Sequence, residues 1–380
     1  MDKYSLAFSI SNLGPKSFQK LFNEFGTSER AWNATELAYK ELGILGLTFN
    51  KFEKFRREFD YVQYTGHLTK SKVEFIGFED KRYPESLKKI ENPPIGLFCK
   101  GNLELLRYPG FTGELRNIDS GSEAEMTRTG TLIIGVVGTR RITQYGRDVT
   151  SMLVSDLVKN GTIIVSGLAL GVDAMAHHVT LENHGLAIAV LACGVDCCLP
   201  SENYSLYSQI LKQNGLIISE YPLSQPPNKG TFLARNRIVA AISDGLLITE
   251  AAEGSGSLVT SEYALQYGKK VFAVPGQINS QMSKGSIGLI KKGGILVQDA
   301  QDILSEFGTK NFKSKTSKNQ FKNLSKEEKK IVMLIENEGL TIDEIARESK
   351  LPISKIFILI SNLELSGIVK NNAGKLLVVK

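Results

Sequence analysis

Two segments in the middle of this sequence combine residue types that bind phosphate groups. Arg235-Asn236-Arg237 places two guanidinium groups and an amide side by side. Gly254-Ser255-Gly256-Ser257 follows an apolar run and precedes a helical pattern. Unpaired N–H groups at the start of a helix bind anions, glycine lets an anion approach the backbone, and arginine pairs with phosphate oxygens. We therefore expect residues 230–276 to hold a phosphate-bearing ligand, which is a nucleotide, an acidic metabolite or a nucleic-acid backbone.

A further arginine motif and an acid–histidine pair occur earlier in the chain. Gly138-Thr139-Arg140-Arg141 follows an apolar run, and its glycine allows a tight turn that would place Arg140 over the end of a strand. Asp173 and His177 are four residues apart, so they share one face of a helix. They could form an acid–base pair. Because no nucleophile lies beside them, we interpret them instead as a helix cap and a packed histidine whose hydrogen bonds are satisfied.

Several motifs of nucleotide-binding proteins and hydrolases are missing from the sequence. It contains no G-x-x-x-x-G-K-[ST] and no G-x-G-x-x-G at the first helix of the sheet region, which argues against a P-loop ATPase and against ordinary dinucleotide binding. It also lacks a nucleophile elbow with Ser, His and Asp. Cys193, Cys197 and Cys198 cluster without a second Cys or His pair at zinc spacing. We therefore expect reduced thiols, no metal and no cofactor.

From residue 131 to about 307, short apolar runs alternate with helical patterns. The runs that we predict as strands are Leu132–Val137, Thr162–Val165, Ala187–Leu191, Leu216–Ser219, Gly245–Thr249, Lys270–Val274 and Gly294–Val297. Continuous Val, Ile and Leu runs are typical of strands that are buried on both faces of a parallel sheet. The alternation with helices predicts an α/β protein with a Rossmann-like, doubly wound, mostly parallel sheet. Ligands of such folds bind beyond the carboxyl ends of the strands, where the motifs above lie.

Smaller domains are expected on both sides of this region. Residues 1–65 have helical spacing and predict a small helical domain of the helix-hairpin-helix or SAM-like kind. The Rossmann-like domain would span 66–308, with a polar insertion at 111–130 to which we assign no function. Residues 309–323 contain five lysines and no acid, which predicts a basic linker. Residues 324–380 predict a helix-turn-helix followed by a two-stranded wing, which together form a winged-helix domain.

The composition narrows the class of protein. The 380 residues are enough for two or three domains, and 42% are hydrophobic and 23% charged, as in ordinary globular proteins. The net charge of +6 is compatible with nucleic-acid binding without requiring it. No apolar run approaches the ~20 residues of a membrane helix, and the first residues lack the apolar core of a signal peptide. We therefore expect a cytoplasmic protein that does not contact membranes.

Seven motifs, in this order, resemble the DNA-processing protein A family (DprA, also called Smf). They are VVGTRR, SGLALGVDAMAHHVTL, LACGVDCCLP, ISEYPL, FLARNRIVAAIS, AAEGSGSLVTSEYAL and VFAVPG. The match covers roughly residues 70–305, and the flanking helical and winged-helix regions also resemble this family's layout. The resemblance implies a non-enzymatic bacterial protein that binds single-stranded DNA, protects incoming strands during natural transformation and helps load the RecA recombinase. It also implies a homodimer.

The resemblance further implies which residues bind DNA. The predicted set is Gly138, Thr139, Arg140, Phe232, Arg235, Asn236, Arg237, Gly254, Ser255, Gly256 and Ser257. The arginines would hold phosphates, and Phe232 would either stack on a base or pack into the core. Nothing in this set provides a code for base edges, so we expect binding that does not depend on sequence. No catalytic residue is implied.

Three positions differ from the family pattern. Leu170 stands where the family often has a basic residue, which removes one possible phosphate contact. A proline is common where this chain has Leu233 or Ala234, and Ile287 stands where Asn is usual.

Two other functions fit parts of the sequence. Related Rossmann-like enzymes that cleave nucleoside monophosphates to base and sugar phosphate use a glycine-rich phosphate loop followed by a glutamate. Residues 254–257 and Glu262 could form such a site, although the P-G-G-x-G-T loop of these enzymes is absent. A nucleotide-sensing winged-helix regulator would need a recognition helix that reads duplex DNA. The predicted helix at 354–360 has one basic residue and is mainly apolar, which argues against that function.

Overall fold

The computed structural model describes residues 2–11, 13–106, 131–308, 324–335, 339–366, 368–372 and 374–378. The predicted insertion at 111–130 and the predicted linker at 309–323 lie outside these described residues. The chain divides into two compact units, Met1–Phe312 and Lys313–Lys380, and each is described by itself below. Within the described part of the chain, every helix is too short or too polar to span a bilayer.

The first unit contains a nine-stranded sheet with the strand order β1-β2-β6-β5-β4-β3-β7-β8-β9. Its strands are β1 (Glu74–Gly77), β2 (Gly96–Gly101), β3 (Ile133–Val137), β4 (Ile163–Ser166), β5 (Ala187–Val190), β6 (Leu216–Ser219), β7 (Gly245–Ile248), β8 (Lys270–Ala273) and β9 (Ile295–Leu296). Strands β3 to β9 pair in parallel with their neighbours within this group. The predicted Rossmann-like, mostly parallel sheet is confirmed, and all seven predicted strands lie within one residue of their expected ends.

Strands β1 and β2 were not predicted, and they extend the sheet with an antiparallel edge. β1 pairs with β2, and β2 pairs with β6, both in antiparallel register. β1 has only four residues, and a segment that contains the short helix α7 (Glu85–Lys88) separates it from β2. The pair therefore lacks the two-residue turn by which a hairpin is found in a sequence.

The connections of the sheet reverse direction beside β3. From β3 the chain moves to β4, β5 and β6 on one side, and it then returns to β7 on the other side of β3. The carboxyl ends of β3 and β7 therefore flank the switch point of the sheet, where folds of this type bind ligands.

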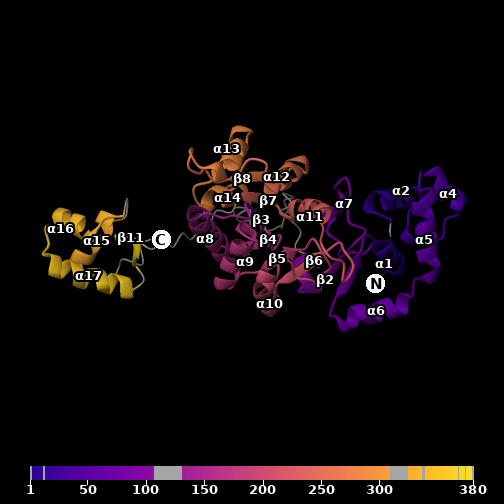
Figure 1. Ribbon diagram of the computed structural model, residues 1–380, viewed down its shortest axis with the longest axis horizontal. Coiled ribbons are helices and arrows are strands. Elements are labelled where there is room, and N and C mark those ends of the chain that lie inside the picture. Colours follow the sequence, from indigo (N-terminus) through magenta and orange to yellow (C-terminus); the bar gives the residue numbers. More distant parts are fainter. Residues whose placement is uncertain are drawn as a thin grey trace, which may run out of the picture. The chain divides into compact units, whose positions relative to one another are not determined.

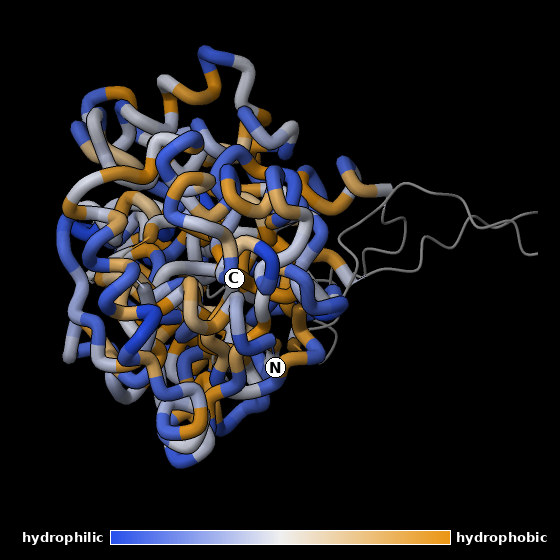
Figure 2. The backbone as a smooth tube through the Cα atoms, turned by 90° about the vertical axis from the view of Figure 1, so that its right-hand side faces the viewer, coloured by the Kyte–Doolittle hydropathy of each residue, from blue (hydrophilic) through white to orange (hydrophobic). Residues whose placement is uncertain are grey.

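Helices cover both faces of the sheet (Figure 1). One face is covered by α11 (Lys229–Ile242), α12 (Gly256–Gln266) and α13 (Lys284–Lys291), and the other by α8 (Gln144–Lys159), α9 (Val172–Glu182), α10 (Tyr204–Lys212) and α14 (Ala300–Glu306). Because side chains alternate along a strand, Ile133 and Val137 pack toward the first layer while Ile134 and Val136 pack toward the second. Figure 2 shows hydrophilic and hydrophobic residues alternating along the backbone, as expected for elements that bury one face.

Six helices precede the sheet, and the first five share an aromatic core. They are α1 (Lys3–Ile10), α2 (Pro15–Phe25), α3 (Ser28–Trp32), α4 (Glu36–Glu41), α5 (Gly46–Glu58) and α6 (Tyr61–Lys70). The Phe8 and Phe52 rings stack with their centroids 5.6 Å apart, and Trp32 meets Phe52 edge-on at 5.3 Å. The helical character of this region is confirmed. Its division at residue 65 and its helix-hairpin-helix type remain predictions.

The second unit is a winged helix. It contains α15 (Lys326–Ile335), α16 (Ile342–Ser349), α17 (Ile353–Leu365), β10 (Val369–Asn372) and β11 (Lys375–Val378). The two strands pair antiparallel, and Leu340 forms a bridge to Leu376 that ties the wing to the helices. Ile331, Ile356 and Leu363 lie in the core between the three helices. The predicted helix-turn-helix and wing are confirmed.

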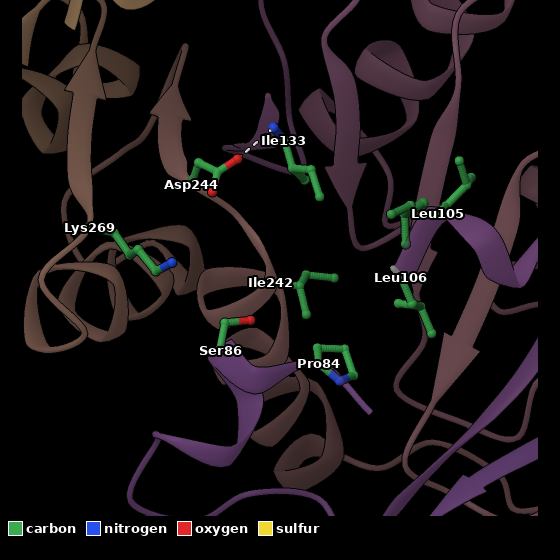
Figure 3. A pocket seen from close by; sticks show the side chains of 9 residues that line it. Pro84, Ser86, Leu105, Leu106, Ile133, Ile242, Asp244 and Lys269 are labelled. Atoms are coloured by element: carbon green, nitrogen blue, oxygen red, sulfur yellow. Dashed lines mark hydrogen bonds between the residues drawn. The ribbon is translucent and has the colours of Figure 1, made fainter. Parts of the chain in front are cut away.

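A small cavity lies near the amino ends of the parallel strands (Figure 3). It measures about 40 Å³, and its lining includes Ile133 at the start of β3 and Asp244 just before β7. The Asp244 carboxylate accepts a hydrogen bond from the Ile133 N–H over 2.8 Å. Small-molecule sites usually occupy about 300–1,000 Å³. This cavity is too small for a nucleotide.

We predict that Phe52→Ala lowers the free energy of unfolding by about 3–5 kcal/mol, because it removes a fully buried ring from the aromatic core. Leu47→Ala lies on the same helix, but Leu47 is 79% exposed, so this control should change stability by less than about 0.5 kcal/mol. Urea unfolding of the full chain measures both effects. Similar values for the two variants would contradict the packing described here.

Candidate nucleic-acid interface

The loops that follow β3, β4 and β7 meet at the switch point. Thr139 N–H donates to the Glu250 carbonyl over 2.8 Å, and Val172 N–H donates to the Thr139 carbonyl over 3.1 Å. Gly171 has a φ of +83° and packs on the Arg140 backbone, so that a Cβ there would lie 2.7 Å from the Arg140 carbonyl carbon. These contacts assemble three loops that are far apart in sequence around Arg140.

Arg140 and Phe232 form the accessible centre of this edge. The Arg140 guanidinium carbon lies 5.0 Å from the centroid of the Phe232 ring, within the range of a cation–π contact. Arg140 is exposed, and Phe232, near the start of α11, is half-buried. A positive charge and an aromatic surface are therefore available to the same ligand.

The predicted glycine-serine loop lies beside α11. Asn236 Nδ2 donates to the Gly256 carbonyl over 3.2 Å. Ser255 is the N-cap of α12, and its Oγ lies 2.8 Å from the Ser257 Oγ. Gly254 has a φ of +72°, and a Cβ at Gly254 or Gly256 would meet no described atom within 4 Å. The space beside the start of α12 is open, as an anion site there requires.

Arg237 is directed into the protein, which corrects the prediction that its charge faces a phosphate. It is 6% exposed, and its Nη1 and Nη2 donate to the two Glu220 carboxylate oxygens over 2.6 and 2.7 Å. Its Nε donates to the Asn92 carbonyl over 2.9 Å. Burial alone would lower the pKa of Arg237, but the Glu220 carboxylate outweighs burial and raises that pKa. Arg237 therefore fastens α11 to the loops after β6 and before β2.

Arg235 is also buried, at 4% exposed, and this corrects the second predicted phosphate contact. Its Nη1 donates to the Val190 carbonyl over 2.5 Å, and its Nε donates to Asn236 Oδ1 over 3.3 Å. The guanidinium lies against Gly167, where a Cβ would be 1.7 Å from Nη1. Only glycine leaves room for the guanidinium there, so Arg235 supports the loops after β4 and β5 from the interior.

Asp173 and His177 are buried on α9, close enough to Arg235 for its charge to influence the pKa of each. Gly171 and not Asp173 is the N-cap of α9, and the Asp173 carboxylate accepts from the Gly167 N–H over 3.2 Å. Burial raises the pKa of Asp173, and the Arg235 charge opposes this effect. Neither ring nitrogen of His177 has a hydrogen bond of normal geometry to a described residue. The prediction of a capping Asp173 is therefore wrong, whereas the prediction that His177 is packed in the interior is confirmed.

Glu250, which the sequence motifs did not single out, occupies the start of α8. Its carboxylate accepts from the Thr143 N–H over 2.9 Å and from the Thr143 hydroxyl over 2.6 Å. A Cβ at Gly146 would lie 2.4 Å from this carboxylate, and a Cβ at Gly138 would lie 2.6 Å from the Glu250 carbonyl oxygen. In dinucleotide-binding folds the start of this first helix holds a pyrophosphate. Here the chain's own carboxylate fills that place.

Exposed cations outside the predicted set lie at or beside the same loops. They are Arg141, Arg147, Lys229 and Lys284. Lys229 opens α11 three residues before Phe232, and Lys284 opens α13. The next residue, Gly285, donates to the Ala251 carbonyl after β7 over 2.8 Å. A basic residue at the first position of a helix that follows a strand is the sequence signal that could have identified Lys229 and Lys284.

The cysteines and other ligand types suggest no metal site in the described part of the chain. Its four cysteines are free, and its His, Cys, Asp and Glu residues form no group that could hold an ion. Burial raises the pKa of Cys198 to about 11 and contributes most to raising that of Cys193 to about 12. Such thiols are protonated at neutral pH, and the protonated form is neither a nucleophile nor a metal ligand.

We predict that His177→Leu makes stability less dependent on pH. Burial and the Arg235 charge lower the pKa of His177 to about 3, compared with 6.5 for an unperturbed histidine. Between these values the unfolded chain binds a proton that the folded chain does not, so stability is greatest above pH 6.5 and is lost as the pH falls. From pH 7 to pH 5, the loss measured by urea unfolding should be about 2 kcal/mol smaller in the variant.

The control for this experiment is His178→Leu, which replaces the neighbouring, exposed histidine of the same helix and keeps His177 in place. Equal losses of stability in the His177 variant and the wild type would contradict the buried, uncharged state of His177.

Two family models match the chain. The model described as DNA recombination-mediator protein A matches residues 74–112 and 122–308, and the DprA winged helix domain matches residues 317–375. Protein Smf from Synechocystis sp. is 33% identical over 309 residues, which are 80% of this chain and 72% of that protein. DNA processing protein DprA from Bacillus subtilis is 36% identical over 239 residues, 63% of this chain and 73% of the relative.

Solved structures agree with these matches. DNA processing protein A from Streptococcus pneumoniae has a TM-score of 0.66 and 30% identity, covering 81% of this chain and 98% of that one. The protein of the same name from Helicobacter pylori, described for its single-stranded DNA binding mode, has a TM-score of 0.50 and 33% identity, covering 61% and 95%. The resemblance seen in the seven motifs is confirmed, and the chain belongs to the DNA recombination-mediator protein A family.

Proposed function

We propose that this chain binds single-stranded DNA at the carboxyl edge of its sheet. The observation that carries the proposal is the exposed Arg140 guanidinium, which lies 5.0 Å from the Phe232 ring beside the switch point. Single strands are bound by cations that neutralise phosphates and by aromatic faces that stack on bases. Membership of the family, and the single-stranded DNA binding described for the Helicobacter pylori relative, support the same function.

The proposed interface keeps most of the residues expected from the sequence. Its members are Gly138, Thr139, Arg140, Phe232, Asn236, Gly254, Ser255, Gly256 and Ser257, with Lys229 and Arg141 as further cations. Arg140 would hold a phosphate, and the start of α12 would hold another. Arg235 and Arg237 act as positioning residues, because their buried contacts fix α11 and thus Phe232.

The proposed contacts use charge and stacking, which do not depend on the identity of the base. The winged helix does not supply a code for base edges in this proposal. The exposed side of α17 carries Ile353, Phe357 and Ile358, and the Lys355 ammonium pairs with the Glu327 carboxylate. An apolar helix face of this kind suits a protein contact better than the major groove.

The biological role proposed here is DNA processing during natural transformation, with protection of incoming strands and loading of the RecA recombinase. We place the protein in the cytoplasm as a homodimer without catalytic turnover. These finer assignments rest on family membership. RecA filament formation on single strands should be faster in the presence of this chain, and sedimentation should give the mass of a dimer. An unchanged rate of filament formation would refute the loading role.

The alternative, a nucleoside-monophosphate phosphoribohydrolase, would use the glycine-serine loop and Glu262, which is exposed on α12. Its substrate would bind at the same edge. Incubation with AMP separates the two functions, because the enzyme would release adenine. We expect no adenine.

We predict that Arg140→Ala weakens binding of single-stranded oligonucleotides by roughly tenfold or more, since it removes a charge-assisted phosphate contact. The loss should be equal on oligo-dT and on mixed sequences. The slope of log affinity against log salt should become shallower by about 0.7. Fluorescence anisotropy across a salt titration measures both quantities.

Arg57→Ala is the matched control for this measurement, because Arg57 is exposed on α5, outside the proposed interface. Arg140→Lys should keep the salt slope while losing part of the affinity. A loss confined to particular base sequences would argue against the proposed mode of binding.

We predict that a chain ending at residue 308 binds single-stranded DNA within about threefold of the full chain, because all proposed contacts belong to the first unit. The comparison uses the same anisotropy assay, with circular dichroism to show that the shorter chain is folded. Complete loss of binding by a folded shorter chain would move the main site to the winged helix.

A further inference from the structure

Three exposed apolar side chains lie at the carboxyl edge of β4 and β5, outside the proposed interface. Leu170 is 41% exposed, Leu199 is 43% exposed and Tyr204 is 64% exposed. Leu170 belongs to the loop after β4, Leu199 to the loop after β5, and Tyr204 is the first residue of α10. We refer to these three residues as the apolar shelf.

Hydrogen bonds join the two loops of the shelf. Asn203 Nδ2 donates to the carbonyls of Leu168 and Ala169 over 2.9 and 3.2 Å. Since Ala169 precedes Leu170 and Asn203 precedes Tyr204, these bonds hold the two exposed side chains on neighbouring segments. The contacts are buried and use a fixed amide, so the relative position of the two segments is well defined.

The Tyr204 ring rests on a fixed partner. Its plane is 12° from that of the Tyr207 ring, with the centroids 6.2 Å apart. The Tyr207 hydroxyl donates to the Val195 carbonyl over 2.6 Å, and Tyr207 is 6% exposed. Lys100, from β2, approaches the same Tyr207 ring at 5.9 Å. An exposed ring held over a buried one keeps a flat surface toward solvent at little further cost in entropy.

The shelf continues directly from the proposed interface. Gly171 follows Leu170 and packs on the backbone of Thr139 and Arg140, where a Cβ would lie 2.2 Å from the Thr139 carbonyl oxygen. Val172 N–H bonds to that same carbonyl. A DNA single strand that contacts Arg140 would therefore reach the loop of Leu170 as its next neighbour. Tyr204 lies on the segment that is hydrogen-bonded to that loop.

The charges around the shelf favour bases over phosphates. The sequence from 171 to 211 contains no lysine or arginine, and Glu202 is exposed two residues before Tyr204. Asp196, in the loop after β5, accepts from the Ser224 N–H and hydroxyl. Apart from Lys100 at the Tyr207 ring, the charged side chains named here are acidic, so the aromatic surface stacks on bases and does not neutralise phosphates.

We infer that the bases of the bound single strand, beyond the nucleotide held at Arg140 and Phe232, stack on Tyr204 and contact Leu170. This inference rests on the proposed function, and it names a second base-binding position on the same edge. Binding at this position depends on the base face and not on charge. This second position extends the bound part of the DNA single strand toward β5.

Anisotropy titrations with oligo-dT and with an oligonucleotide of equal length containing abasic sites test this inference. Tyr204→Ala should weaken binding of oligo-dT by about 5- to 140-fold and leave the salt slope unchanged. The abasic oligonucleotide lacks the base that would stack on Tyr204. The difference in affinity between the wild type and Tyr204→Ala should therefore be smaller with this oligonucleotide than with oligo-dT. Tyr204→Phe keeps the ring and should bind as the wild type does. Leu47→Ala, an exposed apolar control on α5, should have no effect.

The outcomes separate the inference from the proposed function. One possible result is that oligo-dT binds to the wild type and to Tyr204→Ala equally well, while Arg140→Ala no longer binds it. This result would refute base stacking on the apolar shelf and would leave the proposed main site intact. An equal loss on both strands, or a shallower salt slope in Tyr204→Ala, also refutes base stacking there. If the wild type binds no single strand, or if Arg140→Ala has no effect, the proposed function itself fails.

Discussion

Two arginines buried beneath the carboxyl edge of the sheet determine the geometry of everything above them. Arg237 forms a two-point ion pair with Glu220, and Arg235 lies against Gly167 and bonds to the last carbonyl of β5. Removing one partner of a buried pair costs about 3–5 kcal/mol, so α11 is held firmly in place. Because Phe232 lies near the start of α11, this fixation sets the aromatic surface on which the Arg140 guanidinium rests. Arg235 and Arg237 therefore act as support, whereas Arg140, which lies 95 and 97 residues before them in the sequence, acts at the surface.

The two helix starts at this edge explain which ligand the fold accepts. At α8 the Glu250 carboxylate occupies the place where related folds hold a pyrophosphate, and it is fixed there by both donors of Thr143. At α12 the space beside Gly254 and Gly256 is open. The usual nucleotide position is closed and an elongated, accessible edge remains, bordered by Arg140, Phe232 and exposed cations. Such a surface suits a linear polyanion, which is the basis for proposing a nucleic-acid strand rather than a mononucleotide.

The sequence predicted the parallel sheet because its strands are buried on both faces and therefore appear as uninterrupted apolar runs. Strands β1 and β2 were not predicted because they are short and are not joined by a tight turn. The predicted phosphate contacts of Arg235 and Arg237 on α11 were wrong for a different reason. The residue type shows that a side chain is charged, but it does not show whether that side chain points to solvent or into the protein. The signal was present, since residues 238–242 are apolar and leave that helix little surface for solvent. The pairing of Arg140 with Phe232, the Glu250 contact and the shelf around Tyr204 depend on long-range packing, which spacing along the chain does not encode.

The central claim is that a single strand lies across the edge between Arg140 and Phe232. Photo-cross-linking of the full chain to an oligonucleotide containing 5-iodouracil, followed by identification of the modified peptide, tests this claim most directly. Cross-links on the peptide that contains Phe232, or on the peptide that contains Tyr204, are the predicted result, because aromatic rings that stack on the base react efficiently. Cross-links confined to the winged helix, with none in residues 131–308, would contradict the account.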